Sequence, residues 1–150
     1  VISFATHAEV FGTFDDFNEP FLVLSPPKKG SKNNDGLLTT SEISELNLNA
    51  ELVILSACNT SSKANKYAAG FSGLINSFFS AGSKSVIATH WPVEDEAGYL
   101  LMSETMKKVI KSDLSISEAL QSTKLEFIKG KYGERFKKPF YWAPYVYVGL

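Results

Sequence analysis

The fold of this chain is decided by one stretch, Leu52-Val53-Ile54-Leu55-Ser56-Ala57-Cys58-Asn59-Thr60. Its four large apolar residues predict a short buried strand of a parallel sheet over Leu52–Ser56. Polar residues and the only cysteine of the chain follow directly after this strand. Two further apolar runs, Val1–Thr6 and Ser85–Thr89, predict parallel strands of the same kind, and Tyr145–Val148 is also typical of a strand.

Helical patterns lie between these strands. Residues 71–79 carry apolar side chains at helical spacing, and Gly82 provides a stop for that helix. A second helix follows Glu94–Glu96 and ends near Lys111, since acidic residues at the start and basic residues at the end suit the helix dipole. Its buried stripe is predicted to contain Met102, Met106, Val109 and Ile110.

Two capping boxes predict the starts of further helices. Thr39-x-x-Glu42 opens a short helix, and Ser115-x-x-Glu118 opens one that buries Ile116, Ala119, Leu120 and Phe127. Strands that alternate with helices predict an α/β fold, a mostly parallel sheet flanked by helices. The segments Ser25–Gly36 and Thr60–Lys66 are predicted to be loops.

The composition is that of a globular domain with a sizeable core. The chain has 150 residues, of which 44% are hydrophobic and 21% are charged, and its formal net charge is −1. This charge balance argues against nucleic acid or an anionic membrane as a partner. No run approaches the roughly 20 apolar residues of a membrane span. A single cysteine allows no internal disulfide and favours a reducing, cytoplasmic location.

The residues that carry chemistry follow the predicted strands directly. His7 comes after Val1–Thr6, Cys58 after Leu52–Ser56, and His90 after Ser85–Thr89. Ligands of open α/β sheets bind at the carboxyl ends of the strands, so we expect the cysteine and both histidines at one edge of the sheet. With one Cys, two His and no clustered carboxylates, neither a zinc site nor a cofactor is expected.

A cysteine beside a histidine suits nucleophilic catalysis. A free thiol has a pKa near 8.5, so an imidazole on a neighbouring strand is needed as proton acceptor and later as donor to the leaving amine. The backbone N–H groups of Cys58 and Ala8 could hold the oxyanion. We therefore interpret Cys58 as the nucleophile and His7 as its acid–base partner. His90 is the rival base.

Six ordered motifs closely resemble the CHAT domain, a caspase-related module often fused to tetratricopeptide repeats. The match runs in order from Val1 to Gly149, so it covers essentially the whole chain. These motifs are Thr6-His7-Ala8, the segment Asp35–Ile43, Leu55–Thr60, Ala81-Gly82, His90–Asp95 and Tyr141–Tyr145. The histidine precedes the cysteine by 58 − 7 = 51 residues, similar to the spacing of about 50 in caspases.

By this resemblance His7 and Cys58 match the catalytic pair of the family. The resemblance implies a caspase-like parallel sheet and hydrolysis of a peptide bond in a protein partner. Two departures matter. Ala8 stands where caspase-like sites commonly have Gly, and the strands that normally precede the His strand are missing. The chain opens without an initiator Met, so we interpret residues 1–150 as the C-terminal catalytic portion of such a domain, whose exposed sheet edge could pair with another copy.

Other residues are candidates for contacts with the substrate. Glu94, Asp95 and Glu96 could line a pocket for a basic side chain, although acids of the first helical turn are the favoured interpretation. Trp91, Tyr141 and Trp142 could form walls of a substrate groove or simply belong to the core.

Two functions from different classes therefore stand side by side. One is a cysteine endopeptidase with a Cys58/His7 dyad. The other is a caspase-like interaction module without proteolysis, favoured by Ala8 and by the missing N-terminal strands. A glutaminase-type hydrolase is a weaker third alternative, because it predicts glycines on both sides of the nucleophile, where Ala57 and Asn59 stand.

Overall fold

The computed structural model describes residues 1–9, 19–29, 35–56 and 64–149, with side chains of the last range described from Gly70 onward. The described residues form two compact units. The first contains residues 1–91 together with 148–149, and the second contains residues 92–147.

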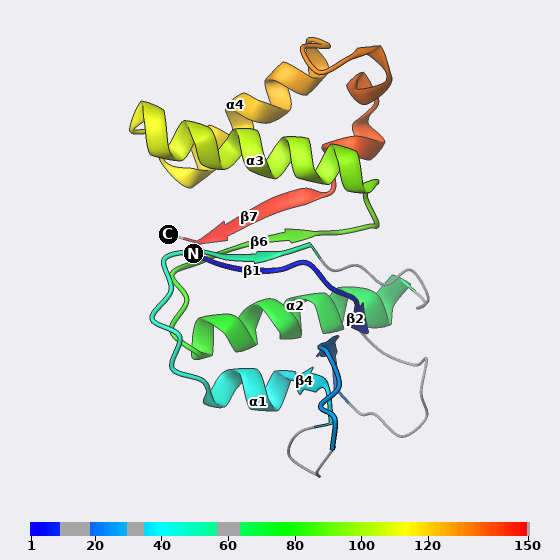
Figure 1. Ribbon diagram of the computed structural model, residues 1–150, viewed down its shortest axis with the longest axis vertical. Helices are drawn as coiled ribbons and strands as arrows, with labels where there is room; N and C mark the ends of the chain where they lie inside the picture. The colour runs from blue at the N-terminus through cyan, green and yellow to red at the C-terminus, as the bar shows by residue number, and fades with distance from the viewer. Residues whose placement is uncertain (10–18, 30–34, 57–63, 150) are drawn as a thin grey trace. The chain divides into compact units, whose positions relative to one another are not determined.

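The first unit is built on a mostly parallel sheet (Figure 1). The order of the four strands is β1-β5-β6-β7. They are β1 (Ile2–Phe4), β5 (Val53–Leu55), β6 (Ser85–Thr89) and β7 (Tyr145–Gly149), of which Val148 and Gly149 belong to the first unit. β5 is parallel to both β1 and β6, and Leu55 pairs with Phe4 on one side and Ala88 on the other. The mostly parallel α/β sheet of caspase type that the sequence predicted is confirmed.

A second, antiparallel sheet in the same unit was not predicted. Its order is β2-β3-β4, and its strands are β2 (Ala8–Glu9), β3 (Phe21–Val23) and β4 (Leu37–Thr39). Each strand has only two or three residues. A period-2 pattern needs about four residues to be recognised, so strands this short leave no reliable signal in the sequence.

Two helices pack in the first unit. α1 (Thr40–Glu45) begins with the predicted capping box, because the Thr39 hydroxyl accepts from Glu42 N–H while the Glu42 carboxylate accepts from Thr39 N–H. α2 (Ala64–Ser80) begins inside the segment Thr60–Lys66, which was predicted to be a loop, and so starts three residues earlier than expected. Figure 1 shows both helices on the same side of the parallel sheet.

The end of α2 follows the predicted stop. Gly82 has a positive φ of 93°, its N–H donates to Phe79 C=O, and Ser83 N–H donates to Phe78 C=O, both at 3.0 Å. This pair of bonds is the Schellman motif, in which a glycine adopts a conformation that other residues avoid. Gly82 therefore lets the chain turn from α2 towards β6.

The core of the first unit joins both sheets to both helices. It contains side chains from the parallel strands, from the antiparallel strands and from α1 and α2. Fully buried members include Leu22, Ile43, Val53, Phe78 and Val86. Burial of several large apolar side chains in one cluster is the main term that stabilises this unit.

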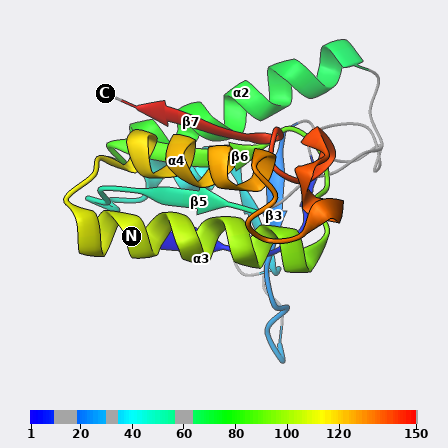
Figure 2. The same cartoon turned by 90° about the horizontal axis from the view of Figure 1, so that it is seen from above.

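The second unit contains two antiparallel α-helices and two 3₁₀ helices. Figure 2 shows α3 (Asp95–Ser112) and α4 (Ile116–Ile128) side by side. α4 begins with the predicted capping box at Ser115 and buries Ala119, Leu120 and Phe127 as predicted, with Thr123 in addition. Ile116, which was also predicted to be buried, is only partly buried because it lies in the first turn at the end of the helix. The 3₁₀ helices η1 (Glu134–Lys137) and η2 (Pro139–Tyr141) follow it.

The predicted buried stripe of α3 is wrong. The buried residues are Ala97, Leu101 and Thr105, whereas Ile110 is 78% exposed. Ala97 and Thr105 are small. The prediction relied on the larger Met and Ile side chains, which lie on a neighbouring face of α3. Small residues are buried as readily as large ones, so side-chain size alone does not identify the buried face of a helix.

One carboxylate links three elements of the second unit. Glu126 of α4 pairs with Lys108 of α3 at 2.7 Å and with Lys131 at 2.9 Å, and it accepts from the Tyr132 hydroxyl at 2.5 Å. Partial burial alone would raise the pKa of Glu126, but the hydrogen bonds from Lys108, Tyr132 and Lys131 outweigh it and lower the pKa to about 2.

Two alanine substitutions in and after α2 test the account of its C-terminus. A Cβ at Gly82 would meet Asn49 N only at 3.5 Å, an ordinary contact, so the cost of Gly82→Ala comes from the positive φ. We expect Gly82→Ala to destabilise the protein by about 1–2 kcal/mol in urea unfolding. Gly73→Ala is the matched control, since a Cβ there has no neighbour within 4 Å and we expect a gain of about 0.5–1 kcal/mol. Equal effects of the two substitutions would contradict the assignment.

The Glu126 cluster predicts an acid-sensitive stability. A carboxylate whose pKa is depressed in the folded state stabilises it above the unfolded pKa, and this contribution is lost as pH falls from about 4.5 towards 2. We expect Glu126→Gln to lower stability by about 1–2 kcal/mol at pH 7 and by much less near pH 2. Thermal unfolding between pH 7 and pH 2 measures this. Glu51→Gln removes only the exposed pair with Lys84 and should have little effect at any pH.

Candidate functional site

The candidate site starts from the register of two neighbouring parallel strands. Phe4 of β1 pairs with Leu55 of β5, and just beyond this pair Ser56 N–H donates to Phe4 C=O at 3.0 Å. Along the chain, His7 comes three residues after Phe4 and Cys58 three residues after Leu55. Cys58 and Ala57 lie outside the described residues. What the described residues establish is that the chain segments leading to His7 and to Cys58 leave adjacent strands at the same edge of the sheet.

His7 lies where the chain passes from the parallel sheet to the antiparallel sheet. It sits between β1 and β2, and its side chain is exposed. Its carbonyl oxygen accepts a hydrogen bond from Val23 N–H of β3 at 2.8 Å. A trans peptide directs its C=O and the following N–H to opposite sides, so the N–H of Ala8 points away from β3.

Ala8, the departure from the glycine of caspase-like sites, has a packing role. Its side chain is 1% exposed and belongs to the core cluster of the first unit. It pairs with Leu22 of β3, which is fully buried. The methyl group therefore adds to the core, while the backbone N–H of the same residue points away from β3.

His90 lies on the opposite side of β5 from β1. It follows the last residue of β6 and is exposed, and its ring stacks on Phe71 of α2 with 4.5 Å between ring centroids and 31° between planes. Strand order β1-β5-β6 thus puts one histidine after each of the two strands that flank β5. His90 directly follows a parallel strand, as expected, whereas β1 ends at Phe4 and His7 lies three residues beyond it. The expected place of Cys58 at the same edge stays a prediction.

The acidic residues after β6 are partly neutralised. Glu94 occupies the N-cap position of α3, and Asp95 and Glu96 lie in its first turn, as the favoured interpretation had it. Arg135 pairs with Glu94 at 3.5 Å and, more closely, with Glu96. Among the residues that the structure describes, Asp95 makes no ion pair or side-chain hydrogen bond, so it is the one acid of the three that keeps an uncompensated charge.

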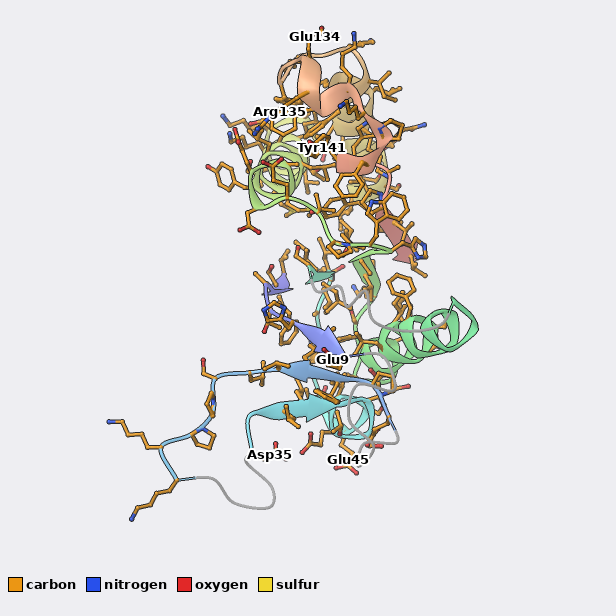
Figure 3. All side chains as sticks on the ribbon, turned by 90° about the vertical axis from the view of Figure 1, so that its right-hand side faces the viewer. Glu9, Asp35, Glu45, Glu134, Arg135 and Tyr141 are labelled. Atoms are coloured by element: carbon orange, nitrogen blue, oxygen red, sulfur yellow. The ribbon has the colours of Figure 1, made fainter. Side chains whose placement is uncertain are left out.

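The aromatic candidates of the second unit are packed side chains. Tyr141 makes edge contacts with Phe136 at 5.3 Å and with Phe140 at 5.6 Å between centroids. Trp142 Nε1 donates to Lys137 C=O at 3.1 Å. Figure 3 labels Arg135 and Tyr141 in this unit. These contacts give Tyr141 and Trp142 a role in packing. Their role as walls of a substrate groove stays a prediction. The same holds for Trp91, which is 36% exposed.

A cavity of the first unit lies away from these strand ends. It has a volume of about 510 Å³ and is lined by Phe79, Ser83, Lys84, Val148 and Gly149. Ser83 and Lys84 immediately precede β6, whereas His90 follows it. The cavity therefore belongs to the amino end of β6, and the candidate site to its carboxyl end.

Sequence reasoning missed the residues that hold the two histidines. Val23 supports His7 and Phe71 supports His90, and neither belongs to a motif that points to a site. Phe71 was assigned only to the apolar face of its helix. Val23 belongs to a three-residue strand, which no pattern predicts.

The described part of the chain also has two features that concern its environment. None of its helices combines the length and the apolar character needed to cross a membrane. No group of three or more His, Cys, Asp or Glu side chains among the described residues could hold a metal ion.

No curated protein matches this chain. The family model described as CHAT domain matches residues 1–150, which is the whole chain. The parallel sheet and the strand-end histidines agree with this match. This chain belongs to the CHAT domain family, which is caspase-like and related to peptidases.

Proposed function

We propose that this chain is a cysteine endopeptidase in which Cys58 is the nucleophile and His7 the acid–base residue. The observation that carries the proposal is the register of β1 and β5, with Phe4 opposite Leu55. Each proposed catalytic residue follows its strand by the same number of residues. Neighbouring parallel strands lie about 4.8 Å apart, so segments of equal length that leave them at one edge can bring their side chains together.

The proposed reaction proceeds in two stages. The Cys58 thiolate attacks the carbonyl carbon of the scissile peptide, and the tetrahedral intermediate collapses as the C–N bond breaks and the His7 imidazolium protonates the leaving amine. Water then attacks the thioester, with His7 accepting its proton. The acid product leaves and the thiolate of Cys58 is regenerated.

Ala8 is the proposed oxyanion donor from the His7 side. Its N–H points away from β3, because the preceding carbonyl is bonded to Val23. A backbone N–H that a ladder does not use can stabilise negative charge on a substrate oxygen. The second proposed donor is the backbone N–H of Cys58. Substitution of glycine by alanine at position 8 leaves this amide in place, since the added methyl belongs to the core.

His90 is the competing candidate for the base. It has the equivalent position after β6, on the other side of β5. Its ring, however, is stacked on Phe71, whereas no ring contact involves His7 among the described residues. We propose that His90 has a supporting role and that His7 transfers the protons.

The same proposal includes five residues as contacts for the substrate, which is a protein or peptide. They are Trp91, Glu94, Asp95, Tyr141 and Trp142. Among the acids, Asp95 is the proposed recognition residue for a basic side chain, because Arg135 already pairs with Glu94 and Glu96. A positive charge gains most from a carboxylate that has no other partner.

Alkylation of Cys58 tests the dyad directly, because the chain has no other cysteine. We expect iodoacetamide to react with Cys58 at pH 6–7 about 10-fold faster than with a free thiol, since a thiolate paired with an imidazolium persists below pH 8.5. His7→Ala should remove this acceleration, and His90→Ala should change the rate by less than about 3-fold. The dyad is wrong if Cys58 behaves as a free thiol and ignores the His7 substitution.

Digestion of a peptide library by the protein separates the two classes of function. We expect cleavage that Cys58→Ala abolishes and that His7→Ala slows by about 100-fold or more in kcat/KM. Asp95→Asn should reduce cleavage after basic residues more than cleavage of other peptides. If no peptide is cleaved and Cys58 also reacts no faster than a free thiol, the non-catalytic interaction module is favoured.

A further inference from the structure

The hydrogen bonds around His7 depart from a regular antiparallel ladder. Ala8 pairs with Leu22 and Glu9 with Phe21, so the register brings His7 opposite Val23. Residues that face each other as a hydrogen-bonded pair exchange two backbone bonds. Val23 N–H does donate to His7 C=O at 2.8 Å. The reciprocal bond, from His7 N–H to Val23 C=O, is not found among the described residues.

The hydroxyl of Thr6 takes the place of this missing backbone bond. Thr6 Oγ1 donates a hydrogen bond to Val23 C=O, the acceptor that a regular ladder would give to His7 N–H. The N–H and the C=O of Val23 therefore both form hydrogen bonds next to His7. One holds the side chain of the preceding residue, and the other holds the carbonyl of His7 itself.

This arrangement determines the direction in which the His7 side chain leaves the backbone. His7 is exposed, so packing does not restrain its imidazole. The direction of its Cα–Cβ bond depends on the two peptides that flank it. Val23 N–H holds the carbonyl of the peptide after His7, and Val23 C=O holds the side chain of Thr6, the residue before it. The same contacts direct the Ala8 N–H, because that group belongs to the peptide whose carbonyl Val23 binds.

We propose that Thr6 is a positioning residue, whose hydroxyl aims the His7 imidazole at the nucleophile and the Ala8 N–H at the oxyanion. This inference rests on the proposed function of Cys58 and His7. Thr6 does not touch the reacting atoms and acts through His7. A displacement of about 1 Å in a catalytic group can cost up to 100-fold in rate, whereas one neutral hydrogen bond contributes little to net stability. Loss of the hydroxyl should therefore affect the rate more than the fold.

Three substitutions isolate the hydroxyl. Thr6→Val keeps the shape and removes the donor, and Thr6→Ser keeps the donor. Thr40→Val is a matched control, because Thr40 Oγ1 also donates to an acceptor in the same unit, the Glu19 carboxylate at 2.6 Å, but at the start of α1. We expect Thr6→Val to lower kcat about 10-fold with KM nearly unchanged, Thr6→Ser to recover activity to within about 3-fold of the original, and Thr40→Val to leave kcat unchanged.

A double substitution shows whether Thr6 acts through His7. Residues that act as a unit are non-additive. We expect Thr6→Val to slow the alkylation of Cys58 in the original protein but to have no further effect in the His7→Ala background. An equal effect in both backgrounds, or no effect in either while His7→Ala does slow alkylation, overturns the inference.

Nuclear magnetic resonance separates failure of this inference from failure of the proposed function. The chain has only two histidines, so His90 is an internal reference. We expect Thr6→Val to shift the imidazole resonances of His7 and to leave those of His90 in place. If His7→Ala does not affect Cys58, the proposed dyad fails whatever Thr6 does. If the His7 resonances ignore Thr6→Val, the positioning role fails even when the dyad is correct.

Discussion

The pairing of β1 with β5 is the constraint on which the rest of this structure depends. Only three residues on each strand form the register, and Phe4 and Leu55 close it at the carboxyl edge. A slip of one residue would turn every side chain of β5 to the other face, but β5 is buried on both faces, so its own burial cannot fix the register. Backbone hydrogen bonds of the residues that flank the two strands hold the register instead. Ser56 N–H on Phe4 C=O extends it at one end, and Ile2 N–H on Leu52 C=O extends it at the other.

The chain changes sheets immediately after this register, and that change gives the site its form. β1 ends in the parallel sheet at Phe4, and Ala8 and Glu9 form the first strand of the antiparallel sheet. The intervening residues cannot follow either ladder completely, so one side chain supplies a bond that the backbone does not make. A regular strand through this point would pair both backbone groups of His7 with Val23, whereas here Val23 bonds only its carbonyl. The Ala8 N–H points away from β3 in a regular ladder too, because Ala8 and Leu22 form a non-hydrogen-bonded pair. The irregularity therefore changes the bonds beside His7 at the sheet edge, where ligands of α/β folds bind.

Much of the fold could be predicted because its long elements carry strong local signals. β6 was predicted with its correct bounds, the two capping boxes were found by their spacing, and Gly82 was identified as the stop of α2. Elements that depend on tertiary contacts could not be predicted. The strands β2 to β4 are too short for a pattern, and α3 buries Ala97 and Thr105 rather than its larger apolar residues. For the site, the sequence identified His7 and His90 at strand ends, but the partners Val23 and Phe71 become neighbours only through the fold.

The two histidines show why a strand-end site is sensitive to its backbone. Both side chains are exposed, so neither is held by a close-packed core. His90 gains restraint from one ring contact, which fixes the plane of the imidazole but still lets it slide on the face of Phe71. His7 gains restraint from two hydrogen bonds to Val23, one at its own carbonyl and one at the hydroxyl of the preceding Thr6, and these restrain the direction of its Cα–Cβ bond. Proton transfer depends steeply on direction and distance, whereas a stacked ring only needs to present a face. This difference in support agrees with the proposal that His7, and not His90, transfers the protons.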